Sequence, residues 1–177
     1  QMGTDIDGEA AGDHSGYSVS LSSDGNIVAI GADRNDGGGN ESGHVRVYDY
    51  VEGRNPEWKQ MGADIDGEAA DDKSGYSVSL SSDGTILAIG APYNNGPTNI
   101  NNIGHVRVYQ YVSGLYVSDW VQVGHDLYGE ANADEFGYSV SLSKNGSTLV
   151  VGAYGYNGNS GRVYTYELVK KPITSIF

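Results

Sequence analysis

The stretch SGYSVSLSSDG, residues 15–25, occurs again unchanged at residues 74–84. A third, altered copy, FGYSVSLSKNG, covers residues 136–146. In each copy Tyr, Val and Leu alternate with serine, which is the period of two expected of a half-buried β-strand. An Asp-Gly or Asn-Gly pair follows each run, and such a pair between apolar segments predicts a tight hairpin turn. We therefore expect a chain built from repeated β-hairpins.

The repeating unit is about sixty residues long, because Gly16, Gly75 and Gly137 occupy corresponding positions. Each turn leads into a nearly apolar strand with the sequence IVAIGA, ILAIGA or LVVGA. A loop rich in Gly and Asn follows, and then a third strand begins as GHVRVYDY, GHVRVYQY or GRVYTYEL. A fourth strand is predicted in EWKQMGADI and DWVQVGHDL, with its tryptophan covering the outer edge. Four antiparallel strands repeated in tandem are typical of β-propeller blades.

These pieces resemble the FG-GAP repeat of integrin α-subunit propellers and related microbial surface proteins. The third unit has FG at residues 136–137 and GA at residues 152–153. The second unit has GAP at residues 90–92, but Ser74 replaces the Phe. The first unit departs from the pattern at Ser15 and Asp33. The resemblance extends over almost the whole chain as far as Leu168.

The predicted fold is all-β, with three tandem four-stranded antiparallel blades that form a partial propeller or half of a dimeric six-bladed ring. Residues 1–14 are expected to supply a strand for a neighbouring or partner blade, followed by an acidic loop. The blades are predicted at residues 15–73, 74–135 and 136–168, the last without its outer strand, and residues 169–177 form a tail. The glycines inside the apolar strands, Gly31, Gly90 and Gly152, are expected to permit close packing near a ring axis.

The charge balance excludes several classes of partner. The chain has 23 Asp and Glu against 10 Lys and Arg, with a net charge of −13 and no cysteine. Such a surface repels phosphate backbones and anionic lipids, so we expect no nucleic-acid partner. The apolar runs are shorter than the roughly 20 residues of a membrane-spanning helix, so we expect no membrane insertion.

An acidic loop precedes each alternating strand, with the sequence DIDGEAAGDHSG, DIDGEAADDKSG or DLYGEANADEFG. Hard cations such as calcium take six to eight oxygen ligands from carboxylates and carbonyls on a turning loop. One interpretation is therefore a Ca²⁺ site; the other is a structural loop whose aspartates accept backbone N–H bonds. The family's own cation loop lies between the first two strands of a blade, where this chain has only a short turn, so its ligands do not transfer. The candidate metal ligands are Asp5, Asp7, Glu9, Asp13, Asp64, Asp66, Glu68, Asp72, Asp126, Glu130 and Asp134.

The acidic loops and the loops rich in Gly and Asn should emerge at the same end of a four-stranded meander, where a ligand would bind. Tyrosines on these loops could stack against sugar rings or pack against a protein partner. The tyrosines of the alternating strands are expected to be packing residues, and the serines to face solvent. The predicted ligand-binding residues are Tyr93, Asn94, Tyr154, Tyr156 and Asn157.

Catalysis is not predicted, because the notable residues recur from unit to unit and no known catalytic motif occurs. His44 and His105 occupy equivalent positions and are interpreted as ordinary residues at the start of a strand. We expect a non-enzymatic, extracellular or cell-surface binding or adhesion module with a protein or glycan ligand. The alternatives are a carbohydrate-binding lectin and a structural subunit of an extracellular assembly. We also expect the chain to form a homo-oligomer or to be part of a longer repeat chain.

Overall fold

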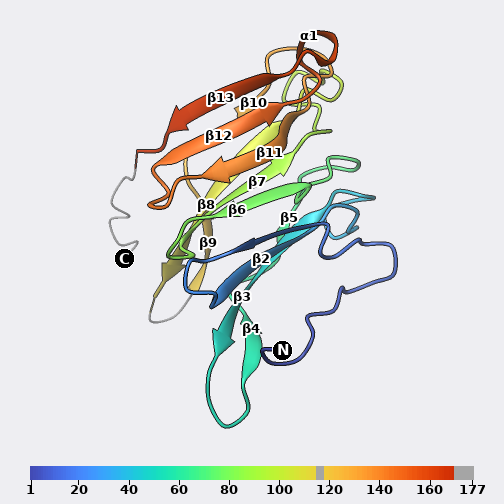
Figure 1. Ribbon diagram of the computed structural model, residues 1–177. Helices are drawn as coiled ribbons and strands as arrows, with labels where there is room; N and C mark the ends of the chain where they lie inside the picture. The colour runs from blue at the N-terminus through green and yellow to red at the C-terminus, as the bar shows by residue number, and fades with distance from the viewer. Residues whose placement is uncertain (115–117, 170–177) are drawn as a thin grey trace.

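The computed structural model describes residues 1–114 and 118–169, and these form three antiparallel sheets stacked side by side (Figure 1). Sheet 1 contains β1 (Ser18–Leu21), β2 (Ile27–Ala32), β3 (His44–Val51), β4 (Glu57–Gln60) and β5 (Ile65–Asp66). Sheet 2 contains β6 (Ser77–Leu80), β7 (Ile86–Ala91), β8 (His105–Ser113), β9 (Ser118–Gln122) and β10 (Leu127–Tyr128). Sheet 3 contains β11 (Phe136–Leu142), β12 (Thr148–Ala153) and β13 (Arg162–Glu167). The all-β, blade-like architecture expected from the repeats is therefore present.

The expectation of four strands in each blade is not confirmed. In sheets 1 and 2 the outer strand is broken into two short strands, which both pair with the third strand. Gly62 lies in the break of sheet 1 with a φ of 75°, a left-handed conformation that interrupts the ladder. Sheet 3 has three strands among the described residues. Of the predicted tail at residues 169–177, all but Val169 lies outside the described residues.

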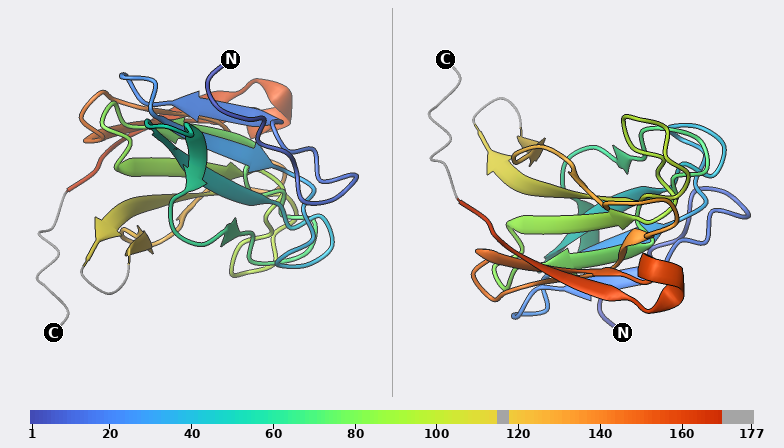
Figure 2. Two further views of the ribbon diagram at one scale, coloured as in Figure 1. Left: turned by 90° about the horizontal axis from the view of Figure 1, so that it is seen from below. Right: turned by 90° about the horizontal axis from the view of Figure 1, so that it is seen from above.

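The long loops between the second and third strands of the sheets lie at one end of the stack, as the sequence predicts. Ser18 pairs with Gly31, and Ala32 pairs with His44, so β1 begins, β2 ends and β3 begins at the same end. We call this the loop end. Figure 2 shows the β2–β3 loop, the β7–β8 loop and the short turn α1 (Tyr156–Asn159) together at this end. The tight Asp-Gly and Asn-Gly turns lie at the opposite end of the sheets.

Neighbouring sheets meet at glycines. A Cβ atom built on Gly31 would lie 2.1 Å from the carbonyl oxygen of Gly75 in the next unit. A Cβ atom on Gly90 would lie 2.1 Å from the carbonyl oxygen of Gly137. Any side chain at these positions would push the sheets apart, so the predicted close packing is confirmed for Gly31 and Gly90.

The serines of the alternating strands do not simply face solvent, and that expectation is wrong. Ser18 Oγ donates a 2.7 Å hydrogen bond to the carbonyl oxygen of Gly75, and Ser77 Oγ makes the same bond to Gly137. Ser20 Oγ accepts from the backbone N–H of Leu80 at 2.9 Å. These hydroxyls therefore join the first strand of one sheet to the first strand of the next, β1 to β6 and β6 to β11.

Apolar side chains of β6 and β11 complete the core of the sheet that precedes each of them. Val78 and Leu80 of β6 belong to the same buried cluster as Val45 and Val47 of β3. A second buried cluster joins sheets 2 and 3 and includes the fully buried Phe136. Because each cluster uses two sheets, a single unit cannot bury its own apolar faces.

The N-terminal segment lies beside sheet 1 without joining it as a strand. Trp58 Nε1 donates to the carbonyl oxygen of Met2 at 3.0 Å, and Trp120 Nε1 donates to that of Met61 at 2.9 Å. Met2 therefore contacts the tryptophan of sheet 1 in the same way that Met61, which follows β4, contacts the tryptophan of sheet 2. That this segment completes a blade of a neighbour or partner stays a prediction. Within residues 1–114 and 118–169, no helix is long and apolar enough to cross a membrane.

Candidate functional site

The last aspartate of each acidic loop is buried and holds the loop together. Asp72 Oδ2 accepts the Ala69 N–H at 3.1 Å and the Asn94 side-chain amide at 2.8 Å. Asp13 makes the equivalent pair of contacts, and Asp134 accepts the N–H groups of two residues in its own loop. Burial raises the pKa of Asp72, and its hydrogen bonds oppose that shift. These three aspartates therefore do what the structural interpretation of the loop requires.

The first aspartate of each loop remains near the surface. Asp5, Asp64 and Asp126 each accept a hydrogen bond from the glutamine four residues earlier, at 2.6 to 2.7 Å. The backbone carbonyls of Asp7 and Asp66 accept from Arg46 and Arg107. The eleven carboxylates proposed as ligands thus do not converge on one site, and their role as Ca²⁺ ligands stays a prediction.

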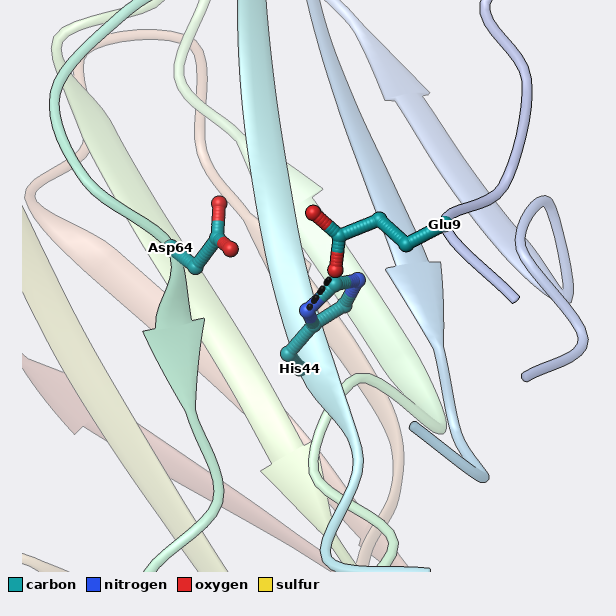
Figure 3. A group of neighbouring side chains, drawn as sticks. All are labelled: Glu9, His44 and Asp64. Carbon is teal, nitrogen blue, oxygen red and sulfur yellow. Dashed lines mark ion pairs between the residues drawn. The ribbon is translucent and has the colours of Figure 1, made fainter. Parts of the chain in front are cut away.

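The structure does bring four of these carboxylates into two clusters, each with a histidine. Glu9 and Asp64 lie beside His44, and Glu68 and Asp126 lie beside His105. In each cluster the candidate ligand atoms all lie within 4.8 Å of one another. Figure 3 shows Glu9 and Asp64 approaching His44 from its two sides. The three residues come from the acidic loop, the start of β3 and the segment before β5.

Both histidines are buried and point a nitrogen at carboxylates without bonding them. His44 and His105 are each 1% exposed, and the Nδ1 atom of each lacks a hydrogen-bond partner. The nearest glutamate oxygen lies 3.8 Å away in both clusters. Burial lowers the pKa of His44, and burial together with Arg107 lowers that of His105 to about 4. Both imidazoles are therefore neutral at neutral pH.

The histidine positions were visible in the sequence, but their role was not. Their equivalence in GHVRVY is plain, yet that pattern predicts only the start of a strand. The contact with Glu9 depends on how the acidic loop folds back over β3, which strand alternation does not encode. The interpretation of both histidines as residues at the start of a strand is confirmed, because β3 begins at His44 and β8 at His105, but their place beside the carboxylates was not predicted.

The third unit replaces the histidine with arginine. Arg162 stands where His44 and His105 stand, since each pairs with the alanine that ends the second strand. Its Nη1 atom lies 2.8 Å from the Oε2 atom of Glu130, the counterpart of Glu9 and Glu68. The guanidinium also packs on the ring of Tyr156, at 3.6 Å from the ring centroid, and bonds its hydroxyl. Asn157, the next predicted ligand residue, lies beside Tyr156 in the turn α1.

A row of tyrosine rings crosses the loop end from sheet 1 to sheet 3. The centroids of Tyr17 and Tyr76 are 4.9 Å apart, those of Tyr76 and Tyr138 are 4.9 Å apart, and those of Tyr138 and Tyr154 are 5.0 Å apart. Tyr93 joins the row at its centre, with its ring edge-on to Tyr76. Burial and the neighbouring hydroxyls raise the pKa of Tyr76. We call these five residues the tyrosine row.

The two ends of the row are open to solvent, with Tyr17 48% and Tyr154 55% exposed. The structure therefore brings together Tyr93 and Tyr154, which were predicted as ligand-binding residues, with three tyrosines that were predicted as packing residues. Asn94 lies apart from them, because it is buried and its amide is held by Asp72. The role of all these residues in ligand binding stays a prediction.

Comparison with known proteins agrees with the repeat pattern. The FG-GAP repeat profile matches residues 4–48 and 129–166. No curated protein matches the chain. Among solved structures, hydrazine synthase of Kuenenia stuttgartiensis is similar, with 14% sequence identity and a TM-score of 0.45. The match covers 85% of this chain and 45% of that one, so the chain spans less than half of its length. FG-GAP repeats are found in extracellular adhesion proteins such as integrins. The profile therefore supports FG-GAP repeats in the first and third units of the sequence repeat.

Proposed function

We propose that the chain is a non-enzymatic, extracellular or cell-surface binding module that holds a protein or glycan ligand at its loop end. The observation that carries this proposal is the tyrosine row, a continuous aromatic surface with exposed ends. Tyrosine offers a large contact area with few rotatable bonds, and aromatic residues are enriched where binding energy concentrates. Its ring can also stack on a sugar while its hydroxyl bonds to polar groups.

The surroundings of the row support a binding role over catalysis. Burial and the nearby carboxylate of Glu135 raise the pKa of Tyr93, and the acidic loops lie at the same end of the stack. These carboxylates favour ligands with basic or hydroxyl-rich surfaces. The tyrosines, glycines and acidic loops recur from unit to unit, as in a repeated binding surface, whereas an active site usually occurs once.

The test is binding of the whole chain to a glycan microarray and to a panel of immobilised extracellular-matrix proteins. We expect a subset of one panel to bind, and the double variant Tyr17→Ala/Tyr154→Ala to lose at least tenfold in affinity. Tyr50→Ala is the matched control, because Tyr50 packs on Trp58 at the outer edge, away from the row. Binding that survives in the double variant, or no binding to either panel, would contradict the proposal. A response confined to glycans would identify a lectin.

A second candidate function, a structural subunit of an extracellular assembly, is supported by the open flanks of the stack. On β1, Val19 and Leu21 are 65% and 57% exposed, although their counterparts Val78 and Leu80 are 9% and 7% exposed. The opposite flank, on sheet 3, carries a hollow of about 440 Å³ lined by Gly152, among others. Within the stack, Val78 and Leu80 of β6 pack against sheet 1, and β1 carries the equivalent side chains Val19 and Leu21. The β1 flank of one chain could therefore pack against the open face of sheet 3 in a second chain. We therefore propose head-to-tail association with a second copy of the chain.

Negative-stain electron microscopy distinguishes the two forms of this association. Closed rings of uniform size are expected if two copies complete each other, and filaments are expected if the contact repeats without closure. Single chains at micromolar concentration would contradict head-to-tail association. The proposal of a binding module would then apply to the single chain.

A further inference from the structure

We propose that sheets 1 and 2 each bind one divalent transition-metal ion of the zinc class at the loop end. The ligands are Glu9, His44 and Asp64 in sheet 1, and Glu68, His105 and Asp126 in sheet 2. This inference is independent of the proposed ligand-binding function. It also differs from the Ca²⁺ site expected from the acidic loops, because its central ligand is a nitrogen.

The spacing of the ligand atoms suits a small ion. Ligand atoms around a tetrahedral zinc ion lie roughly 3.4 Å apart. The Nδ1 atom of His44 lies 3.8 Å from the Oε2 atom of Glu9, too far for a hydrogen bond but close to this value. The same 3.8 Å separates His105 from Glu68. Figure 3 shows that Glu9 and Asp64 face the imidazole from different segments, so small side-chain rotations would close the site.

The buried histidine nitrogen supplies the independent indication of a ligand. His44 Nδ1 is shielded from water and has no hydrogen-bond partner, and His105 Nδ1 repeats this situation in the next sheet. A buried polar atom without a partner is costly and is rare in folded proteins. Coordination by the neutral imidazole would satisfy the nitrogen in both sheets in the same way.

Sheet 3 shows what this position requires when the histidine is absent. There Glu130 is paired with the guanidinium of Arg162 at 2.8 Å, so a cation is already part of the chain. In sheets 1 and 2 the equivalent glutamate lies 3.8 Å from a histidine nitrogen and 3.7 Å from the guanidinium of Arg46 or Arg107. A bound divalent ion would add a second positive charge beside Arg46 or Arg107, in contact with both the glutamate and the histidine nitrogen.

The groups facing the two sites predict that they differ in affinity. In sheet 1 the carboxylates of Glu9, Asp64 and Asp66 surround His44, and Arg46 lies 3.7 Å from Glu9. In sheet 2 the place of Asp66 is taken by Tyr128, whose hydroxyl donates to Asp126 at 2.8 Å. Arg107 lies 3.7 Å from Glu68, as Arg46 does from Glu9. With one carboxylate fewer, the site in sheet 2 should bind the ion more weakly.

The donor set selects the class of metal. Imidazole nitrogen favours zinc and other first-row transition ions, while calcium takes six to eight oxygens and avoids nitrogen. Three protein ligands leave a fourth position for water or for a group on a binding partner. Because the ligands come from residues 9, 44 and 64, the ion would also tie the acidic loop and the outer strand to β3.

The test uses tag-free protein that has been treated with chelator and dialysed, titrated with ZnCl₂ or CaCl₂. Native mass spectrometry gives the number of bound ions, and isothermal titration calorimetry gives their affinities. We expect two Zn²⁺ ions per chain, the tighter one in sheet 1, and no Ca²⁺ at these sites. Glu9→Gln should lose the tighter ion, Glu68→Gln the weaker one, and the double variant both. Glu130→Gln is the matched control and should still bind two ions.

Cobalt spectroscopy reports on the buried ligand. Co²⁺ bound through imidazole should give visible absorption bands, and these should disappear in His44→Gln/His105→Gln. The Glu variants change exposed side chains and should fold normally, so the test does not depend on the histidine variants. Two outcomes would overturn the proposal: no Zn²⁺ bound at micromolar concentration, or unchanged stoichiometry in Glu9→Gln/Glu68→Gln, which means adventitious binding to surface carboxylates.

Discussion

Val106 in sheet 2 and Val163 in sheet 3 occupy the same place in the repeat, but one is buried and the other is exposed. Each lies in the third strand and pairs with the glycine of the second strand, Gly90 or Gly152. Val106 is fully buried, as is Val45 in sheet 1, whereas Val163 is 68% exposed. Sheet 2 has a neighbour on both faces, and sheet 3 has one only on the side of sheet 2 (Figure 1).

This comparison shows that burial in the stack is decided by the next sheet and not by the strand's own sequence. All three units carry valine at this position, so each strand is suited to being covered on both faces. A repeat that places apolar residues on both faces of a sheet depends on its neighbours for stability. Matched substitutions in the two sheets therefore measure what a neighbouring sheet contributes.

The largest contrast is expected from a charge at the two valines. Val106→Asp buries an unpaired carboxylate and should cost about 4 kcal/mol or more, which is enough to unfold many domains. Val163→Asp places the charge on the open flank and should cost less than about 1 kcal/mol. Urea unfolding of dilute protein, followed by tryptophan fluorescence, measures both values. Equal losses would mean that Val163 is as enclosed as Val106 within a single chain.

Alanine at the strand glycines should give the next largest difference. In Gly90→Ala the new Cβ would meet the carbonyl oxygen of Gly137 at 2.1 Å, so the sheets must separate at a cost of about 3 kcal/mol. In Gly152→Ala the close contact is only the hydroxyl of Ser139, at 2.4 Å, which can rotate away. Thermal unfolding by calorimetry should show a large fall in Tm for the first variant and little change for the second. A similar fall in Tm for both variants would mean that the added methyl group strains its own sheet and that the contact between sheets is not the cause.

The smallest contrast concerns the inter-sheet serines. Ser77→Ala removes the hydrogen bond to the carbonyl oxygen of Gly137 and should cost about 1 kcal/mol. Ser139→Ala, at the equivalent place beside the open flank, should change the free energy of unfolding by less than about 0.5 kcal/mol. Urea midpoints of the two variants test this. If Ser77→Ala is as neutral as Ser139→Ala, the hydroxyl bonds contribute nothing to joining the sheets.

Much of the fold could be predicted because it is encoded locally. The alternation in SGYSVSLS and the Asp-Gly turns determine the hairpins, and the order of strands determines which loops share an end. The role of the serines could not be predicted, because alternation marks two faces without saying what covers them. Ser18 meets Gly75 only after two units have stacked, so the same pattern suits solvent and a neighbouring sheet equally well.

The candidate sites show the same division. The acidic loops were recognisable, and the structural role of Asp72 follows from a familiar loop pattern. The grouping of Glu9, His44 and Asp64 was not predictable, because three segments must come together over the start of β3. The tyrosine row likewise forms from tyrosines of all three units. It could not be predicted from the sequence of any one unit.

The measurement that tests the central claim most directly is the absolute mass in solution, by light scattering, of the wild-type chain and of Val163→Asp. If the open flanks continue the stack head to tail, the wild-type mass should be near twice the 18.7 kDa of one chain, or a higher multiple. Val163→Asp should then return the mass to that of a single folded chain. A wild-type protein that is monodisperse at 18.7 kDa at every concentration would contradict the claim.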